Sequence, residues 1–288
     1  MPPSQTISAL GAVLSGTPAP AIHARKSCAS LLSRQLLRPE GVLGLCAAVF
    51  GDGGDPEDNI QLEKLEHIAK VLSTGPTGLK PKVKYFYLSN GPHSRDTQEY
   101  FDLIVPRILA LLSNPSPLSY RRAAAFTLSR MLAMDSSRGH QLLAASSIIP
   151  ILHDPFLQVI DLGRQGLSPD SHSPVPTELP YTLSPTSALS TLMALILHTD
   201  PSPTLISTLL SPIMPCLYTL SAHLNCMKTA DPLLRESVNG LLTTWGRVVV
   251  SEECLSNLWY VLEGAGGDWL ITIAGDVRKV ERYVHHIK

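Results

Sequence analysis

The chain has little charge, few aromatic residues and no paired cysteine motif. Only 16% of its 288 residues are charged, and 23 lysines and arginines balance 24 aspartates and glutamates to give a net charge of −1. A chain this close to neutral has no general electrostatic attraction for nucleic acid, so we expect no direct contact with RNA or DNA. Aromatic residues make up 6%, which favours helices over a β-sandwich or barrel.

Cysteines are few, and long uninterrupted apolar runs are absent. The five cysteines are odd in number and include no Cys-x-x-Cys pair. We expect most of them to be buried thiols in a reducing compartment, with a Cys216–Cys226 disulfide as the alternative. The amino-terminal segment lacks the basic start and apolar core of a signal peptide. Pro212 and Pro215 interrupt the most apolar stretch, Leu205–Leu220, which falls short of the ~20 apolar residues of a membrane span. We therefore predict a soluble chain without a transmembrane segment.

Helical periodicity is what the chain does have, most clearly between Tyr100 and Ala133. Two runs of apolar residues with i, i+4, i+7 and i+8 spacing are separated by a proline-rich turn, Asn114–Pro117. The runs are Ile104, Ile108, Leu111 and Leu112, then Ala124, Leu128, Met131 and Leu132. Pro106 in the first run and the Arg121–Arg122 pair opening the second are typical of HEAT-type helical hairpins.

The second half of the chain repeats this pattern. Pro215–Leu220 is similar to Pro106–Leu112, and Asp231-Pro232 takes the place of Asn114-Pro115, with Arg235 early in the helix that follows. Repetition of one hairpin is typical of stacked arrays. We therefore predict an all-α fold, a HEAT/armadillo-like α-solenoid of stacked helical hairpins.

Breaks in the periodicity divide the chain into six segments. We expect a tail or frayed helix over 1–21, helical repeats over 22–73 and a loop or insertion over 74–98. A HEAT-like hairpin with its following helix should occupy 99–162. A Pro/Ser-rich linker should occupy 163–184, and further helical repeats 185–288.

Residues 83–98 do not fit their surroundings. Val83-Lys84-Tyr85 is compatible with a 5′ splice signal, Leu88-Ser89-Asn90 with a branch point and Thr97-Gln98 with a 3′ signal. The length suits a small fungal intron. We hypothesise a retained intron or gene-model error, which sequencing of the transcript would test. The alternative is a genuine Ω-like loop.

No segment carries a convincing catalytic or metal-binding pattern. Gly51–Asp58 has the wrong ligand spacing for a calcium loop, and we expect a solvated loop. Gly264–Trp269 has a tryptophan where a dinucleotide-binding loop has its last glycine, and we expect a turn linking two helices. His153-Asp154 and His285-His286 lack further ligands at metal spacing, and we expect surface histidines. We predict a protein that is not an enzyme, with no catalytic, cofactor or metal residues.

A few residues are candidates for partner contacts. Arg121, Arg122 and Arg235 could contact acidic groups of a protein partner. The alternative for the arginines of the Arg121 helix, which include Arg130, is pairing with carboxylates of the neighbouring hairpin. Trp245 could contact a partner, but its position within an apolar stripe predicts a core residue.

Several segments resemble one family of large eukaryotic proteins. The similar segments are Arg38–Gly44, Ala47–Phe50, Leu62–Lys82 read on into Glu99–Ser113, Thr199–Pro203, Leu209–Pro212, Lys228–Leu233 and Gly240–Arg247. The family that they resemble includes the animal transport and Golgi organisation protein six and fungal factors described in RNA polymerase II assembly or nuclear import. Family members are much longer, so the resemblance implies a truncated member.

The resemblance also implies a function. It implies a scaffold in protein transport and secretion, in Golgi organisation, or in RNA polymerase II assembly and nuclear import. Its partners would be proteins, such as RNA polymerase II subunits, nuclear-pore components or trafficking components. The expected location is the cytoplasm, with shuttling to the nucleus or association with secretory membranes. The alternative is a generic HEAT-like adaptor that binds a single protein partner.

Overall fold

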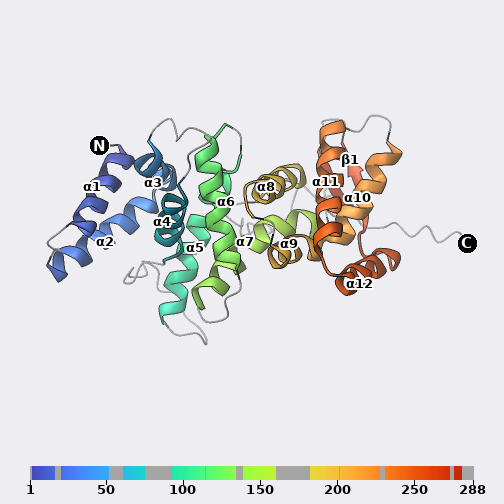
Figure 1. The fold of residues 1–288 in the computed structure, drawn as a ribbon. Coiled ribbons are helices and arrows are strands. Elements are labelled where there is room, and N and C mark those ends of the chain that lie inside the picture. The colour runs from blue at the N-terminus through green and yellow to red at the C-terminus, as the bar shows by residue number, and fades with distance from the viewer. Residues whose placement is uncertain are drawn as a thin grey trace, which may run out of the picture. The chain divides into compact units, whose positions relative to one another are not determined.

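The protein is mostly helical, as expected (Figure 1). The computed structural model describes residues 2–16, 21–51, 61–74, 92–113, 115–133, 139–159, 182–200, 202–227, 231–272 and 276–280. The chain divides into two compact units. Unit 1 comprises Met1–Ile148 with Leu197–Thr199, and unit 2 comprises Ile149–Ile196 with Asp200–Lys288.

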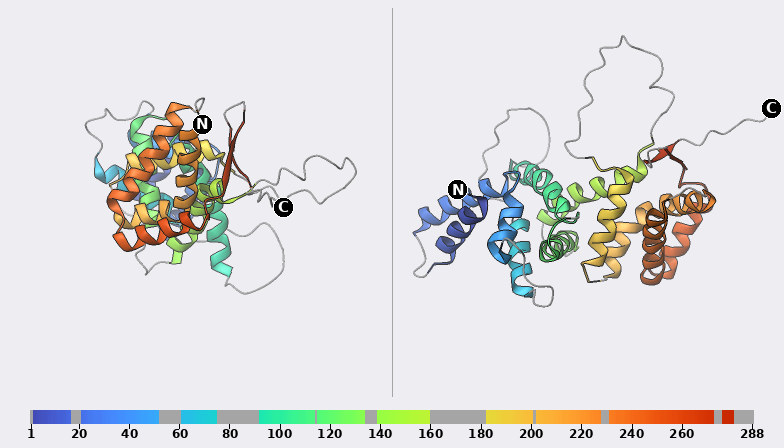
Figure 2. Two further views of the ribbon diagram at one scale, coloured as in Figure 1. Left: turned by 90° about the vertical axis from the view of Figure 1, so that its right-hand side faces the viewer. Right: turned by 90° about the horizontal axis from the view of Figure 1, so that it is seen from above.

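Unit 1 is built from helices that lie side by side (Figures 1 and 2). The helix α3 packs against both α1 and α2, and α6 packs against α3, α4 and α5. The bounds are Pro3–Ser15 for α1, Ile22–Leu36 for α2, Gly41–Phe50 for α3, Leu62–Ser73 for α4, Pro92–Ala110 for α5 and Leu118–Leu132 for α6. The division between the two units falls within α7, Gly139–Leu157.

The apolar stripes predicted between Tyr100 and Ala133 form the core of unit 1. All eight of their residues are buried, and Ile104, Ile108 and Leu128 have no exposed surface. Ile68 and Leu72 of α4, the helix that packs on α6, are equally inaccessible. Complete burial of such side chains contributes about 1.5–3 kcal/mol each. The sequence prediction of a helical pair with one buried stripe per helix is therefore confirmed.

A polar network ties α5 to α7 within unit 1. Gln98 Nε2 donates to Asp102 Oδ1 at 2.8 Å and to Ser147 Oγ at 2.7 Å. Ser146 Oγ donates to Gln98 Oε1 at 3.0 Å. The helix α5 begins at Pro92. The last residues of the loop expected over 74–98 are therefore helical, and the boundary expected after Gln98 lies inside α5. The rest of that loop, residues 75–91, lies outside the described residues, as does most of the linker expected over 163–184.

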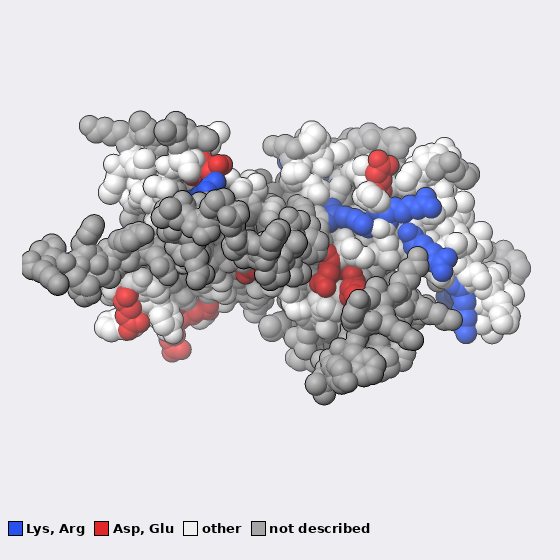
Figure 3. Space-filling model, turned by 180° about the vertical axis from the view of Figure 1, so that it is seen from behind, with Lys and Arg blue, Asp and Glu red and all other residues white. Residues whose placement is uncertain are grey.

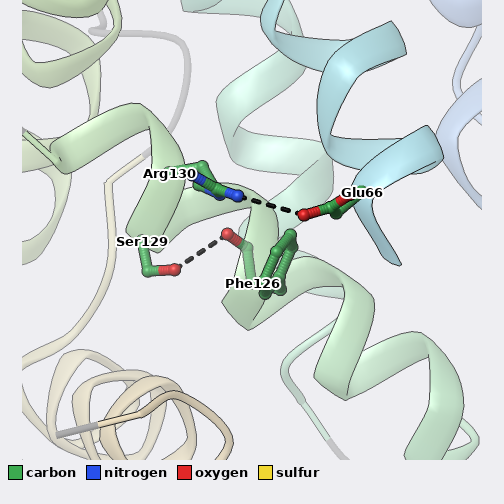
Figure 4. Close-up of polar contacts among 4 residues, drawn as sticks. All are labelled: Glu66, Phe126, Ser129 and Arg130. Atoms are coloured by element: carbon green, nitrogen blue, oxygen red, sulfur yellow. Dashed lines mark hydrogen bonds and ion pairs between the residues drawn. The ribbon is translucent and has the colours of Figure 1, made fainter. Parts of the chain in front are cut away.

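An ion pair connects α6 to α4 (Figure 4). Arg130 Nη2 lies 3.3 Å from Glu66 Oε1, and its guanidinium lies 5.4 Å from the centre of the Phe126 ring. Both charged side chains are more than half exposed, so solvent screens the pair and its contribution to stability is small. For Arg130, pairing with a neighbouring helix is thus confirmed.

Unit 2 packs around the helix α10, Met214–Cys226, which contacts α11, α12 and the strand β1. The other helical elements are Pro185–Leu197 for α8, Pro203–Leu210 for α9, Ser211–Ile213 for the 3-10 turn η1, Pro232–Val248 for α11 and Ser251–Leu262 for α12. Ser184 Oγ accepts the Ser187 amide at 3.1 Å, and Asp231 Oδ1 accepts the Leu233 amide at 3.0 Å. These side chains satisfy free amides at the starts of α8 and α11, as a serine or aspartate before a first-turn proline predicts.

A two-stranded antiparallel hairpin follows α12, where we expected only helices. Its strands are β1, Asp268–Ile271, and β2, Val277–Val280, and Trp269 stands opposite Lys279. Trp269 Nε1 donates to Thr219 Oγ1 of α10 at 3.0 Å, and the Trp269 ring lies 6.5 Å from that of Phe156. The expected turn between helices at Gly264–Trp269 instead leads from a helix into this strand.

One stretch of the described residues, Pro203–Cys226, has the length and composition of a membrane-spanning helix. It has 24 residues and a mean hydropathy of 1.4, and 61% of the tested window is buried inside the protein. The expectation that the apolar stretch here is shorter than a membrane span was wrong. In the structure it comprises α9, η1 and α10, and its leucines form the core of unit 2.

Candidate functional site

A hollow in unit 1 lies among its first four helices. It measures about 1060 Å³ and is lined by residues of α1, α2, α3 and α4, with Tyr100 of α5 at its base. Pockets for small ligands usually measure ~300–1,000 Å³, so this hollow is large enough for a segment of a polypeptide. We call it the cationic groove, because basic side chains line its rim.

The walls of the groove are apolar and its rim is positively charged. Arg25, Lys26, His67 and Lys70 are exposed and line it, and no Asp or Glu is among its described lining residues. The apolar lining consists mainly of Ile7, Leu14, Leu32, Leu36, Leu45, Val49 and Val71. Figure 3 shows Lys and Arg side chains gathered on one face of unit 1 (right in this view). Such a surface attracts ligands that combine an apolar face with carboxylates or phosphates.

Helical spacing brings these side chains together. Arg25 and Lys26 are in the first turns of α2, and Ala29, Leu32 and Ser33 follow along the wall. His67 and Lys70 are three positions apart on α4, with Val71 and Thr74 beside them. Residues three and four apart share one face of a helix, so each helix presents cations beside small or apolar side chains.

Buried hydrogen bonds hold the base of the groove. Tyr100 Oη donates to the carbonyl oxygen of Leu72 at 3.1 Å, and burial raises the Tyr100 pKa well above its ordinary value. Arg107 Nη1 donates to the carbonyl oxygen of Leu36 at 3.1 Å, at the end of α2, and partial burial lowers the Arg107 pKa. Both side chains therefore bind backbone and do not face a ligand as free polar groups.

Arg121 and Arg122, predicted as partner contacts, lie in the first turns of α6. Arg122 is exposed and Arg121 is half-buried. Both are close to His198, whose pKa is lowered by burial and by repulsion from the two guanidinium groups. The pair is thus part of a second positively charged cluster in unit 1, separate from the residues that line the groove.

Arg235, the third predicted contact, has an internal role. Its Nη2 donates to the carbonyl oxygens of Leu224 and Met227, at 3.3 Å each. These are among the carbonyls at the end of α10 that no further turn of helix satisfies. Arg235 belongs to unit 2 and Arg121 to unit 1, so the described contacts do not join them into one site.

The cysteines are free, but their environments differ from our expectation. Only Cys46 and Cys216 are buried, whereas Cys226 is exposed, so the prediction that most would be buried was wrong. Burial raises the pKa of Cys46 to about 12, which leaves an unreactive thiol at neutral pH. Cys216 Sγ accepts a hydrogen bond from Lys279 Nζ at 3.3 Å.

For two single side chains, the structure corrects one prediction and confirms the other. His153 is buried, not on the surface, and its Nε2 lies 2.8 Å from the carbonyl oxygen of Leu209. Trp245 is 2% exposed and is a core residue, as predicted. Residues His285 and His286, and the acidic loop beyond Gly51, lie outside the described residues. Within the described part of the chain, no three His, Cys, Asp or Glu side chains form a group that could hold a metal ion.

The burial of His153 predicts that unit 2 loses stability in acid. Desolvation lowers the pKa of His153 in the folded state, whereas the unfolded chain keeps a pKa of about 6.5. Below that pH the unfolded state binds a proton that the folded state excludes, so the free energy of unfolding falls by up to ~1.4 kcal/mol per pH unit. Urea unfolding between pH 7.5 and 5.5 measures this slope. His153→Gln should flatten it, and an unchanged slope in that variant would contradict the assignment.

Comparison with known proteins gave no match. No protein-family model, no curated protein and no solved structure is similar to this chain at the level of significance required. The cationic groove is therefore defined by its geometry and charge alone. We did not predict this groove from the sequence, although the adjacent Arg25 and Lys26 beside small residues of one helix were a partial signal.

Proposed function

We propose that this protein is a non-enzymatic helical-repeat scaffold that binds protein partners. The observation that carries the proposal is the order of helix contacts. In unit 1, α1 packs on α3 and α4 on α6, and in unit 2, α9 packs on α11 and α10 on α12. Contact between every second helix is expected when hairpins stack in a HEAT/armadillo-like array, because equivalent helices of successive hairpins then lie side by side.

The cationic groove is the proposed binding site for a client segment. An amphipathic helix could place its apolar face on Leu32, Val49 and Val71, with its carboxylates beside Lys26 and Lys70. Helix-in-groove binding is a recurring mode of peptide recognition. Opposite charges around the apolar contact add specificity and speed association. The site thus favours an acidic amphipathic helix as its ligand.

The pathway proposed is protein transport, either in secretion and Golgi organisation or in RNA polymerase II assembly and nuclear import. Support comes from the resemblance of segments such as Leu62–Lys82 and Gly240–Arg247 to the family named above. The proposed partners are RNA polymerase II subunits, nuclear-pore components or trafficking components. A cytoplasmic location fits these roles, with shuttling to the nucleus or association with secretory membranes.

Binding of a designed peptide tests the groove. The probe is a fluorescein-labelled helical peptide with a leucine stripe flanked by glutamates, and its binding is followed by fluorescence anisotropy. We expect Lys26→Glu with Lys70→Glu to weaken binding more than about tenfold, since two attractive contacts become repulsive. The matched control is Arg34→Glu, an exposed cation of α2 that does not line the groove.

Three results would reject the groove as a peptide site. They are equal binding of the peptide by the double variant, an equal loss with Arg34→Glu, and preference for a lysine-flanked version of the same peptide. Displacement of the peptide by a single-chain anionic amphiphile such as dodecyl phosphate, at lower concentration than the peptide itself requires, would assign the hollow to a lipid-like ligand instead.

Affinity purification distinguishes a scaffold of the proposed transport pathway from a generic adaptor with a single protein partner. RNA polymerase II subunits, nuclear-pore components or coat components recovered with the wild-type chain but not with the Lys26→Glu/Lys70→Glu variant would support the proposed pathway. Reproducible recovery of one unrelated protein would favour the generic adaptor. These two results leave the peptide experiment intact, because it concerns only the chemistry of the groove.

A further inference from the structure

The helix α12 of unit 2 has an apolar face that points to solvent. Leu255, Leu258, Trp259 and Leu262 are 69%, 36%, 61% and 78% exposed. We call these four residues the outer stripe. Their spacing of i, i+3, i+4 and i+7 places them on one side of the helix. The inner side, with the buried Asn257, contacts α10, so the outer stripe is not used in packing α12 onto unit 2.

Single exposed apolar residues are common, whereas contiguous ones mark interaction sites. The outer stripe is contiguous, and it includes the exposed Trp259, a residue type enriched among the strongest contributors to protein interfaces. Trp259 Nε1 donates to Glu263 Oε1 at 2.7 Å. This hydrogen bond satisfies the indole N–H and joins Trp259 to a carboxylate at the end of the helix.

The charges beside the outer stripe have one sign. Glu252 and Glu263 are exposed, and helical geometry places both along the Trp259 edge of the stripe. Glu253 is half-buried and accepts a hydrogen bond from Ser207. No lysine or arginine occurs between Ser251 and Glu263.

We propose that the outer stripe binds an amphipathic helix of another protein, one that carries lysines or arginines beside its own apolar stripe. The leucines and Trp259 supply the apolar contact, and Glu252 and Glu263 pair with the partner's cations. This surface is distinct from the cationic groove and has the opposite preference for charge. It does not depend on the function proposed for the groove.

Charge argues against two other occupants of the outer stripe. In a symmetric antiparallel pair of α12 helices, Glu252 of one copy would approach Glu263 of the other, and the like charges would repel. A helix lying on an anionic membrane needs lysines or arginines beside its apolar face, and α12 carries glutamates there. A basic partner helix satisfies both the apolar stripe and its carboxylates.

Trp259 provides a direct readout of the proposed binding. The chain has three tryptophans, of which Trp245 and Trp269 are 2% and 5% exposed. The difference between the wild-type spectrum and that of Trp259→Phe therefore isolates the exposed indole. The probe is a synthetic helical peptide with a leucine stripe flanked by lysines, which should shift this emission to shorter wavelength by removing Trp259 from water.

Two pairs of variants test the origin of the binding. Leu262→Ser should weaken it by about thirtyfold, because a polar group would replace the most exposed leucine of the stripe. Leu233→Ser, at an exposed leucine of α11 outside the stripe, should not change it. Glu252→Gln with Glu263→Gln should weaken it by about tenfold, whereas Glu236→Gln on α11 should not. Added salt should weaken wild-type binding and have less effect on the glutamine variant.

Any of four results would overturn the proposal. They are the absence of a shift with the lysine-flanked peptide, an equal shift with a glutamate-flanked peptide, and an equal loss of binding in the α11 control variants. The fourth is occupation of the outer stripe by a second copy of this chain or by a membrane. A Trp259-dependent dimer in sedimentation would show the former, and a shift of Trp259 emission on vesicles containing phosphatidylserine would show the latter.

Discussion

Trp245→Ala lowers the free energy of unfolding of unit 2 by about 3–5 kcal/mol, the expected cost of removing a fully buried aromatic side chain from a packed core. Trp245 extends from α11, and its Nε1 donates to Ser211 Oγ of η1 at 2.9 Å. The substitution therefore leaves a cavity and removes a hydrogen bond between two helical elements. Urea denaturation followed by far-UV circular dichroism measures the loss.

Trp259→Ala is the matched control for this result. It removes the same side chain from the same unit, but at a position that is 61% exposed, so we expect a change within about 0.5 kcal/mol. Trp245→Phe should fall between the two, because it keeps most of the ring volume and loses the hydrogen bond. Equal destabilisation by Trp245→Ala and Trp259→Ala would show that Trp245 does not have the core role assigned to it.

Gly266→Ala should destabilise unit 2 by about 3 kcal/mol, at the upper end of the usual cost of overpacking. A Cβ at this position would meet the carbonyl oxygen of Pro215 and the side chain of Thr219. The backbone at Pro215 cannot move without displacing α10. The same close approach lets Thr219 Oγ1 donate to the Gly266 carbonyl oxygen at 3.2 Å.

The control for Gly266→Ala is Gly246→Ala. A Cβ at Gly246, within α11, would meet no atom within 4 Å, so alanine should stabilise that helix by about 0.5–1 kcal/mol. Opposite signs for the two substitutions in urea denaturation would support the close packing at Gly266. A neutral Gly266→Ala would mean that the segment after α12 does not pack on α10 as described.

The helices could be predicted from the sequence because each core helix carries its own signal. The stripe from Ile104 to Leu112 has the helical period within a single segment, and Asp231 before Pro232 marks a helix start locally. Tertiary packing fits these signals, so the expected buried residues are buried.

The hairpin and the groove could not be predicted in this way. Each strand of the hairpin has four residues, too few for alternation to stand out, and its stability comes from Trp269 packing against Thr219 of a distant helix. The groove is lined by residues of four helices, and the few lining residues of any single helix do not form a pattern that predicts a binding site. His153 was misassigned because the lack of further ligands at metal spacing led us to expect a surface histidine, whereas the hydrogen bond to Leu209 compensates for its burial.

The division of the chain has a consequence for how its unfolding must be measured. All three tryptophans, Trp245, Trp259 and Trp269, belong to unit 2, whereas helices of both units contribute to circular dichroism. Tryptophan fluorescence therefore reports on only part of the molecule. If the units unfold independently, the fluorescence and dichroism transitions will not coincide, and a single two-state fit will average two different stabilities. Coincident transitions would instead mean that the two units unfold as one cooperative domain.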